Sequence, residues 1–168
     1  MQEKEILAGY YEIVKGLENR VVVLFDPQDM DKSDLDLQTL GKKRNTEYQY
    51  AFDYVFDEES TQEDVFRNTT EFLLDGAIQG YNSTVFAYGA TGAGKTYTML
   101  GTSSNPGVMC LTFDKLFRLV SQEQSDHQFQ IKLSYLEIYN EVIRDLLAKS
   151  PHEKSLELWE DPMKGSVV

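Results

Sequence analysis

The sequence has one cysteine, four prolines and no apolar run approaching the ~20 residues that span a bilayer. The single cysteine, Cys110, excludes a disulfide framework and a thiolate metal site, and it favours a reducing compartment, the cytoplasm. Cys110 lies in the apolar run VMCL and is predicted to be a small core residue. The N-terminal segment MQEKEILAGYY lacks the basic start and apolar stretch of a signal peptide.

Basic side chains are also scarce. The sequence has 16 lysines and arginines against 28 aspartates and glutamates, which gives a formal net charge of -12. Such a charge argues against binding of the whole chain to nucleic acid or to an anionic membrane. The main basic cluster is Lys42, Lys43 and Arg44, within GKKRNTE. It is either a solvated loop tip or a local contact with an acidic partner.

The remaining composition, 41% hydrophobic and 26% charged over 168 residues, is typical of one globular domain with a core. Apolar stretches with strand-like composition predict strands at 10–13, 20–25, 48–56, 83–88, 129–139 and 155–160. The stretch 83–88 is apolar enough to be buried on both faces. The polar residues 28–46 are predicted to form a loop.

Helical spacing predicts a helix behind the capping box Ser60-Thr-Gln-Glu63, with Ser60 as N-cap and Gly80 after its end. Further helices are predicted from Lys95 to Gly101, from Leu111 to Val120 and, as one or two turns, over 141–147. Strands that alternate with helices predict an α/β fold with the sheet in the middle.

The most informative stretch is YNSTVFAYGATGAGKTYTML, from Tyr81 to Leu100. It contains the pattern G-x-x-x-x-G-K-[ST] of a phosphate-binding P-loop, placed between a predicted strand and a predicted helix. Glycines allow the backbone to curl until several amides point inward, and the following helix adds the positive end of its dipole. The alternative is a glycine-rich turn without ligand. The candidate phosphate-binding residues are Gly89, Ala90, Thr91, Gly92, Ala93, Gly94, Lys95 and Thr96.

In a P-loop the lysine contacts the β- and γ-phosphates, and the hydroxyl of the next residue coordinates Mg²⁺. Lys95 is therefore the candidate catalytic residue, and Thr96 is the candidate metal ligand. Hydrolysis also needs groups that sense the γ-phosphate and position water. No D-x-x-G follows the loop, and no N-K-x-D is present to select guanine. The sequence thus predicts the nucleotide-binding half of an NTPase site and shows no residues for the hydrolytic half.

Four segments resemble the motor domain of kinesins. They are FDYVFDEESTQEDVF (52–66), GYNSTVFAYGATGAGKTYTMLG (80–101), PGVM (106–109) and SYLEIYNEVIRDLL (134–147). The resemblance extends over most of the chain, from about Val21 to Val168. The sequence GATGAGKTYTMLG, followed by NPGVM, most resembles the corresponding sequence of the kinesin-8 subfamily. Members of this subfamily move to microtubule ends and often shorten them. Residues 1–168 are thus interpreted as one partial kinesin-like motor domain.

The resemblance implies a P-loop NTPase sandwich with a central, mostly parallel sheet that binds ATP and Mg²⁺. It assigns the phosphates to Gly89 through Thr96 and places Tyr97 beside the adenine, although Tyr97 equally fits a helix residue packed on the sheet. It implies a cytoskeletal protein with the microtubule as partner. Lys42, Lys43 and Arg44 would then make a minor microtubule contact.

The sequence also departs from the family pattern. The first strand with R-x-R-P, switch I (N-x-x-S-S-R-S-H) and switch II (D-L-A-G-S-E) are absent, as is the C-terminal half of the motor. The chain alone is therefore expected to be inactive. The leading hypothesis is the ATP-binding part of a motor that couples hydrolysis to movement or end depolymerisation. The alternative is a truncated, non-hydrolysing nucleotide-binding fragment, and a small-molecule kinase is disfavoured because no arginine-rich lid is visible.

Overall fold

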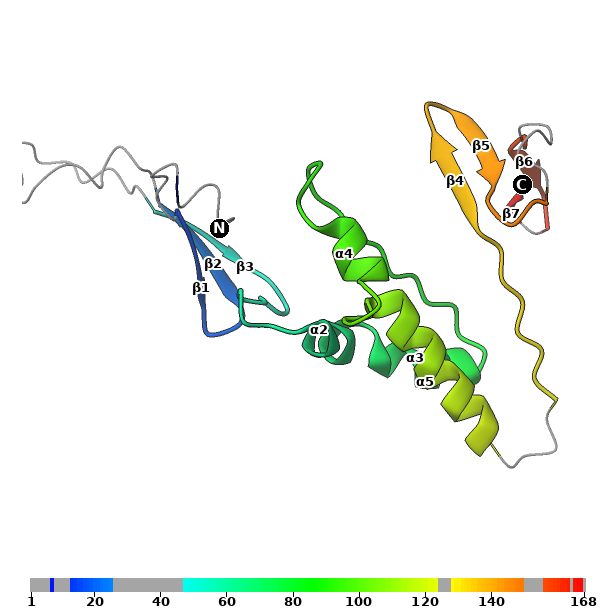
Figure 1. Cartoon of the computed structure of the whole chain (residues 1–168), viewed down its shortest axis with the longest axis horizontal. Helices are drawn as coiled ribbons and strands as arrows, with labels where there is room; N and C mark the ends of the chain where they lie inside the picture. Colours follow the sequence, from blue (N-terminus) through cyan, green and yellow to red (C-terminus); the bar gives the residue numbers. More distant parts are fainter. Residues whose placement is uncertain are drawn as a thin grey trace, which may run out of the picture. The chain divides into compact units, whose positions relative to one another are not determined.

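The structure, a computed structural model, describes residues 7, 13–25, 47–123, 128–149, 156–163 and 165–167 (Figure 1). The chain divides into two compact units, Met1–Glu123 and Gln124–Val168. The predicted loop 28–46, with its basic cluster, lies outside the described residues, as does most of the strand predicted at 10–13. None of the helices in the described ranges is both long and apolar enough to cross a membrane.

The first unit begins with an antiparallel sheet of three strands in the order β1 (Val14–Leu17), β2 (Val21–Phe25) and β3 (Glu47–Ala51). The β1–β2 connection is a tight turn, closed by a hydrogen bond from the amide of Arg20 to the carbonyl of Leu17 at 3.2 Å. Its central residues, Glu18 and Asn19, both have positive φ, as the twist of a tight hairpin favours. The strand predicted at 20–25 is confirmed as β2, whereas the one predicted at 48–56 ends at Ala51.

Three helices form the small core of the first unit: α2 (Gln62–Thr69), α3 (Glu71–Ile78) and α5 (Val108–Gln122). Phe66, Leu74 and Val108 are buried together, one from each helix. The helix predicted from Leu111 to Val120 is confirmed as part of α5. Burial of these apolar side chains between the helices removes them from water and stabilises the packing.

The single helix predicted behind the capping box is two helices, which break at Thr70. The backbone of Thr70 leaves helical geometry, with φ -124°. Just before it, the hydroxyl of Thr69 donates to the carbonyl of Val65 at 2.6 Å. Such back-bonding by a β-branched hydroxyl residue competes with the helical ladder and bends helices. The predicted end is confirmed, because α3 ends at Ile78 and Gly80 has φ +97°.

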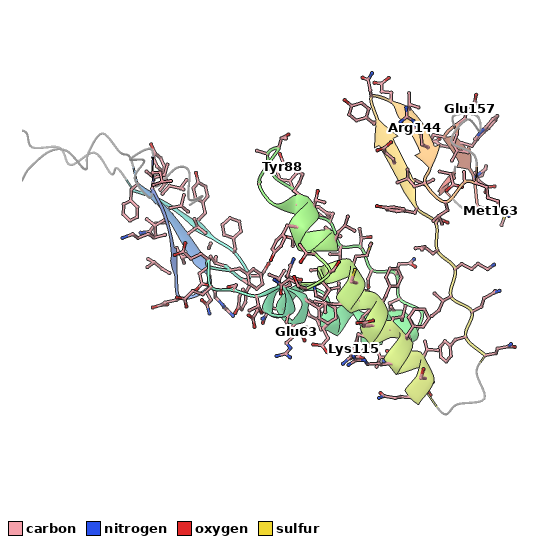
Figure 2. All side chains as sticks on the ribbon, viewed as in Figure 1. Glu63, Tyr88, Lys115, Arg144, Glu157 and Met163 are labelled. Carbon is pink, nitrogen blue, oxygen red and sulfur yellow. The ribbon has the colours of Figure 1, made fainter. Side chains whose placement is uncertain are left out.

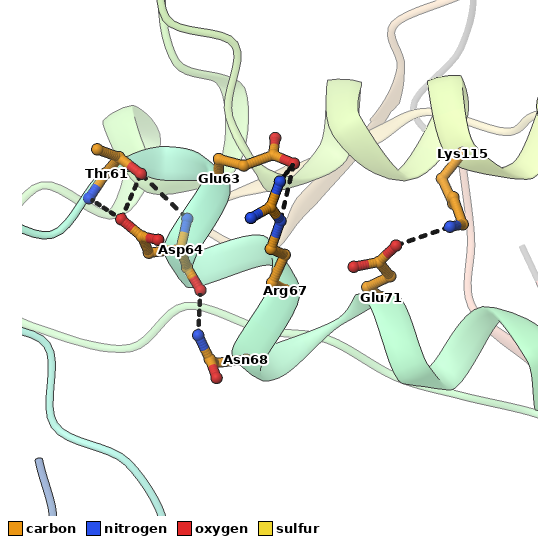
Figure 3. Close-up of polar contacts among 7 residues, drawn as sticks. All are labelled: Thr61, Glu63, Asp64, Arg67, Asn68, Glu71 and Lys115. Carbon is orange, nitrogen blue, oxygen red and sulfur yellow. Dashed lines mark hydrogen bonds and ion pairs between the residues drawn. The ribbon is translucent and has the colours of Figure 1, made fainter.

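The predicted capping box is displaced by one residue (Figure 3). The N-cap is Thr61, whose hydroxyl accepts from the amide of Asp64 at 3.1 Å, and the Asp64 carboxylate accepts from the amide of Thr61 at 2.9 Å. Ser60 is not the cap, since its hydroxyl donates to the carboxylate of Asp57 at 2.8 Å. The sequence satisfies the box in both registers, and the competing Asp57–Ser60 bond leaves Thr61 to begin the helix.

The segment leading into the P-loop is not a strand in the structure, contrary to the prediction for 83–88. Residues 81–88 form neither a helix nor a strand, and among the described residues no strand pairs with them. Phe86 is 80% exposed, and Tyr88, which is 96% exposed, projects from the loop before α4 (Figure 2). An extended chain becomes a strand only when a neighbour completes its hydrogen bonds, so apolar composition alone did not suffice.

The second unit contains two hairpins, β4 (Leu136–Tyr139) with β5 (Val142–Asp145), and β6 (Trp159–Asp161) with β7 (Gly165–Val167). All strand pairs in both units are antiparallel where the structure describes them. The strand predicted at 129–139 is a strand only from Leu136, as β4. The strand predicted at 155–160 is confirmed in part, through β6 and an isolated bridge of Leu156 to Ile143.

The helical turns predicted over 141–147 are wrong, because these residues carry β5. Asn140 and Glu141 have φ +50° and +64°, which turns the chain back on itself so that Leu136 pairs with Asp145. Arg144 and Glu137 face each other across the hairpin, with Nη1 3.5 Å from Oε2. The apolar spacing of this segment fits a helix or a strand, and the preceding turn decides between them.

Candidate functional site: the glycine loop and its helix

The candidate site is the loop 89–94 together with α4 (Lys95–Leu100), the helix that follows it. This confirms the helix predicted from Lys95 to Gly101. Gly92 and Gly94 have φ +83° and +94°, a left-handed conformation that a side chain disfavours. Gly94 stands directly before the first residue of α4. The loop can therefore reverse direction and present its amides at the start of the helix.

Lys95 folds back across the loop. Its ammonium group donates to the carbonyl of Gly89 at 2.9 Å and to the carbonyl of Ala90 at 2.9 Å. A further bond, from the amide of Ala93 to the carbonyl of Ala90 at 3.1 Å, closes the turn between them. The lysine side chain thus ties the first residue of α4 to the two residues that open the loop.

Several other backbone amides of the loop and of the start of α4 have no partner among the described residues. Those of Gly92, Gly94, Lys95 and Thr96 donate to no group in the part of the chain that the structure describes. The first amides of any helix lack an intrahelical partner, and here the left-handed glycines extend that run into the loop. Unpaired amides at the start of a helix, three of them consecutive (94–96), together with the nearby lysine can form a site for an anion. The exposed Thr96 lies in this run, and an oxygen donor there suits a hard cation.

The carboxyl end of α4 is held by contacts from two directions. The carbonyl of Leu100 accepts from the amide of Gly107 at 3.0 Å and from the thiol of Cys110 at 3.7 Å. The carbonyl of Tyr97 accepts from the side-chain amide of Gln62 at 2.5 Å. Cys110 is exposed, so the core position predicted for it is wrong. It lies on α5 with its thiol turned to the end of α4 rather than into the apolar cluster.

A closed loop, residues 101–107, joins α4 to α5. Gly101 bridges to Pro106, and the amide of Thr102 donates to the carbonyl of Asn105 at 2.8 Å. The backbone at the two ends of this loop is closely packed. A Cβ on Gly101 would lie 2.2 Å from the carbonyl oxygen of Asn105, and a Cβ on Gly107 would lie 2.6 Å from the carbonyl oxygen of Met99. Both glycines are therefore required by close backbone approach.

All residues from Gly89 to Tyr97 that the sequence nominates lie in one described segment, and Lys95 contacts two of them. The ring of Tyr97, 51% exposed, is neither buried nor part of a core. Sequence reasoning missed Gln62, which is 35 residues from Tyr97 along the chain and which no local pattern connects to the loop. No group of three or more His, Cys, Asp or Glu side chains arranged for a metal ion occurs within the described ranges.

A glycine loop of this pattern, with a lysine and a threonine opening a helix, defines a P-loop nucleotide-binding protein. Within that class, a family model described as "Kinesin motor domain" matches residues 12–168, and the chain belongs to the kinesin motor domain family.

The relatives place it more narrowly. The chain is 46% identical to mouse "Kinesin-like protein KIF18B" over 171 residues (98% of this chain), 46% identical to human "Kinesin-like protein KIF19" over 157 residues (94%) and 45% identical to "Kinesin-like protein KIN-8B" of Arabidopsis thaliana over 157 residues (94%). These are kinesin-8 proteins, so the predicted subfamily resemblance is confirmed. The chain spans only 20%, 15% and 18% of their respective lengths.

Two solved structures are similar to the whole chain. "Structure of a fast kinesin" matches with a TM-score of 0.80 and 31% identity, and covers 99% of this chain and 43% of its own. A structure of KIF14 as a dimer with AMP-PNP "in complex with a microtubule" matches with a TM-score of 0.76 and 26% identity, at 99% and 44% coverage. The predicted fold class, an incomplete P-loop NTPase of the kinesin type, is confirmed. The described strands pair in separate antiparallel sheets, and no central sheet is assembled among them.

Proposed function

We propose that this chain is the ATP-binding part of a kinesin-type motor that couples ATP hydrolysis to movement along microtubules or to depolymerisation of their ends. One observation carries the proposal: the glycine loop and the first turn of α4 contain both the ammonium group of Lys95 and backbone amides without a partner among the described residues. Membership of the kinesin motor domain family supports it. The chain is less than half of a solved motor, so hydrolysis and movement are proposed for a protein of motor length.

The chemistry of the loop fits a polyphosphate. The amides of Gly92, Gly94 and Lys95 would donate to phosphate oxygens without a proton transfer or a rearrangement of charge. Lys95 would exchange two neutral carbonyl acceptors, on Gly89 and Ala90, for charged phosphate oxygens, and hydrogen bonds between charged groups are the stronger ones. The exchange would leave those carbonyls to solvent, which is available because the loop is largely exposed.

Thr96 would hold Mg²⁺ through its hydroxyl, as the second residue of α4 beside the phosphate-binding amides. When bound, the metal neutralises charge on the β- and γ-phosphates. Tyr97 would lie beside the adenine, which its exposed ring permits. Selection of ATP over GTP is proposed from the family, since the sequence has no guanine-selecting motif.

The microtubule is the proposed partner, and the cytoplasmic cytoskeleton the proposed location. The solved KIF14 motor in complex with a microtubule supports the microtubule as partner and a cytoskeletal location. Within this chain, Lys42, Lys43 and Arg44 are proposed as a minor contact, because they form the main basic cluster of a chain whose net charge is -12, and a basic cluster suits an acidic track.

The first test is binding of a fluorescent ATP analogue to the purified chain, with and without Mg²⁺, in competition with unlabelled ATP and GTP. We expect saturable binding that ATP displaces better than GTP and that removal of Mg²⁺ weakens. No saturable binding, or equal displacement by both nucleotides, would contradict the proposal.

A second candidate is a non-hydrolysing nucleotide-binding fragment. The observation that favours it is the lack of both switch sequences in these 168 residues. ATP turnover by the chain, measured with and without microtubules, separates the two functions. Turnover that microtubules accelerate supports the motor ATPase for this chain, whereas binding without turnover supports the fragment.

A further inference from the structure

The P-loop helix α4 has only six residues, Lys95–Leu100. An isolated helix of this length is unstable in water, so its position depends on tertiary contacts. Its last four carbonyls have no partner inside the helix. The carbonyl of Tyr97 is one of these, and the side chain of Gln62 supplies its donor at 2.5 Å. This bond connects the helix that carries Lys95 and Thr96 with a helix that begins 33 residues earlier in the sequence.

We propose that Gln62 is a positioning residue of the nucleotide site, which fixes α4 through the hydrogen bond from its Nε2 to the carbonyl oxygen of Tyr97. The inference rests on the proposed function, since it assumes that the loop before α4 binds ATP. Among the described residues, the side chain of Gln62 makes its hydrogen bond to Tyr97 and not to the loop 89–94. It acts through the helix whose first two residues are Lys95 and Thr96.

Gln62 is itself held in place by local structure. It is the first residue of α2, directly after the N-cap Thr61, and the reciprocal Thr61–Asp64 bonds fix the backbone on both sides of it. Its side chain is partly buried. A long, flexible side chain loses less freedom on forming a bond when its own backbone is already ordered. The donor is therefore presented to α4 by a rigid helix start.

The rest of the contact network is indirect. Helix α2 packs on α5, and α5 packs on α4. At the end of α4 the carbonyl of Leu100 is fixed to Gly107, on the α5 side. Within the described residues, the Gln62 bond is the hydrogen bond that joins α2 directly to α4. The carbonyls of Tyr97 and Leu100 are thus two anchors of α4. Two anchors restrict both translation and rotation of a short helix, whereas a helix held at one anchor can still rotate about that point.

The test compares ATP affinity of the full chain with that of three variants. Gln62→Met keeps the length of the side chain but has no donor and no charge. Gln62→Lys restores a donor of similar reach. Arg67→Ala, on the same helix, removes an exposed ion pair with Glu63 and serves as the matched control. Each protein is titrated with a fluorescent ATP analogue and Mg²⁺, and its thermal unfolding midpoint is recorded.

We expect Gln62→Met to weaken binding about fivefold, the equivalent of one ordinary hydrogen bond of about 1 kcal/mol. Gln62→Lys should restore the affinity to within about twofold of the original chain, again one hydrogen bond. Binding is measured at two salt concentrations, because salt screens a long-range effect of the added charge but not a restored bond. Arg67→Ala should bind as the original chain does.

Unchanged affinity in Gln62→Met, or no recovery in Gln62→Lys, would overturn the inference while leaving ATP binding intact. Recovery in Gln62→Lys that disappears at high salt would overturn it as well, since charge alone would then explain the effect. If the original chain and Arg67→Ala both fail to bind, the proposed function itself falls, and the inference falls with it.

Discussion

The ammonium nitrogen of Lys95 lies 2.9 Å from the carbonyl oxygen of Gly89, six residues earlier, and holds the glycine loop closed over itself. The same group lies 2.9 Å from the carbonyl oxygen of Ala90. When an anion binds, the ammonium group of Lys95 can exchange these two neutral carbonyl oxygens for charged oxygens of the ligand. Before binding, the two carbonyls hold the group beside the loop. The first prediction depends on this relationship.

Substitution Lys95→Met should reduce affinity for ATP by at least about tenfold, because a hydrogen bond to a charged group contributes roughly 1.5–3 kcal/mol. The measurement is equilibrium titration with a fluorescent ATP analogue. Lys132→Met, which removes an exposed lysine outside the loop, is the control and should bind normally. Equal affinity of the two variants would mean that Lys95 only stabilises the loop.

The closed loop between α4 and α5 predicts a strong effect on stability. Gly101→Ala places a Cβ 2.2 Å from a backbone oxygen at φ +70°, and Gly107→Ala places one 2.6 Å from another. Because backbone atoms cannot rotate away as side chains do, each change should destabilise the first unit by about 3 kcal/mol or more. Thermal or urea unfolding would show the loss.

A matched glycine serves as the control for that prediction. Gly76 lies inside α3, and a Cβ there would meet its nearest atom, in Tyr81, at 3.9 Å, an ordinary contact. Gly76→Ala should therefore stabilise the chain by about 0.5–1 kcal/mol through helix propensity. A loss of stability as large as that of Gly101→Ala would show that the loop is not specially constrained.

The capping box predicts which hydroxyl begins α2. Thr61→Ala removes the acceptor for the amide of Asp64 and should cost about 1 kcal/mol of unfolding free energy. Ser60→Ala removes two exposed hydrogen bonds, both with Asp57 and neither to an amide of α2, and should cost less. Urea unfolding of the two variants under identical conditions compares them directly. A larger loss of unfolding free energy in Ser60→Ala would instead support Ser60 as the N-cap, as the sequence predicted.

The ion pair between α3 and α5 predicts a pH dependence (Figure 3). Lys115 donates to the carboxylate of Glu71 at 2.7 Å, and this hydrogen bond lowers the pKa of Glu71 from its ordinary value. A carboxyl whose pKa is lower in the folded chain stabilises that chain above its unfolded pKa. The stabilisation is lost as the pH falls from there through the folded pKa.

Unfolding free energy should therefore decline in acid more steeply for the original chain than for Glu71→Gln, which has no proton to bind at this position. The two pH profiles should converge below the ordinary range of a glutamate. Asp64, whose pKa is lowered by the Thr61 hydroxyl and then by the Thr61 amide, contributes in the same direction to both proteins. Parallel profiles for the two proteins would show that the Glu71–Lys115 bond is not maintained in solution.

Several elements followed from local sequence because their causes are local. Helix α4 begins at Lys95, directly after Gly94, and α3 ends before Gly80. The positions of these glycines in the sequence predict both boundaries. Strand β2 was evident from its consecutive apolar residues. Errors arose where two local patterns competed, as in the capping box, or where the turn at Asn140 and Glu141 overrode a helical spacing. In the capping box the bond between Asp57 and Ser60 was decisive, and in the hairpin the positive φ of Asn140 and Glu141 was.

The sequence by itself determined the class of site, because the P-loop is a continuous motif whose glycines, lysine and threonine act through adjacent backbone. It also determined the family, through four segments that extend over most of the chain. Tertiary structure alone decided that residues 81–88 carry no strand partner among the described residues, and that Gln62 reaches the carbonyl of Tyr97. Strand pairing and a contact between helices depend on residues far apart in the chain, and only folding determines which of them meet.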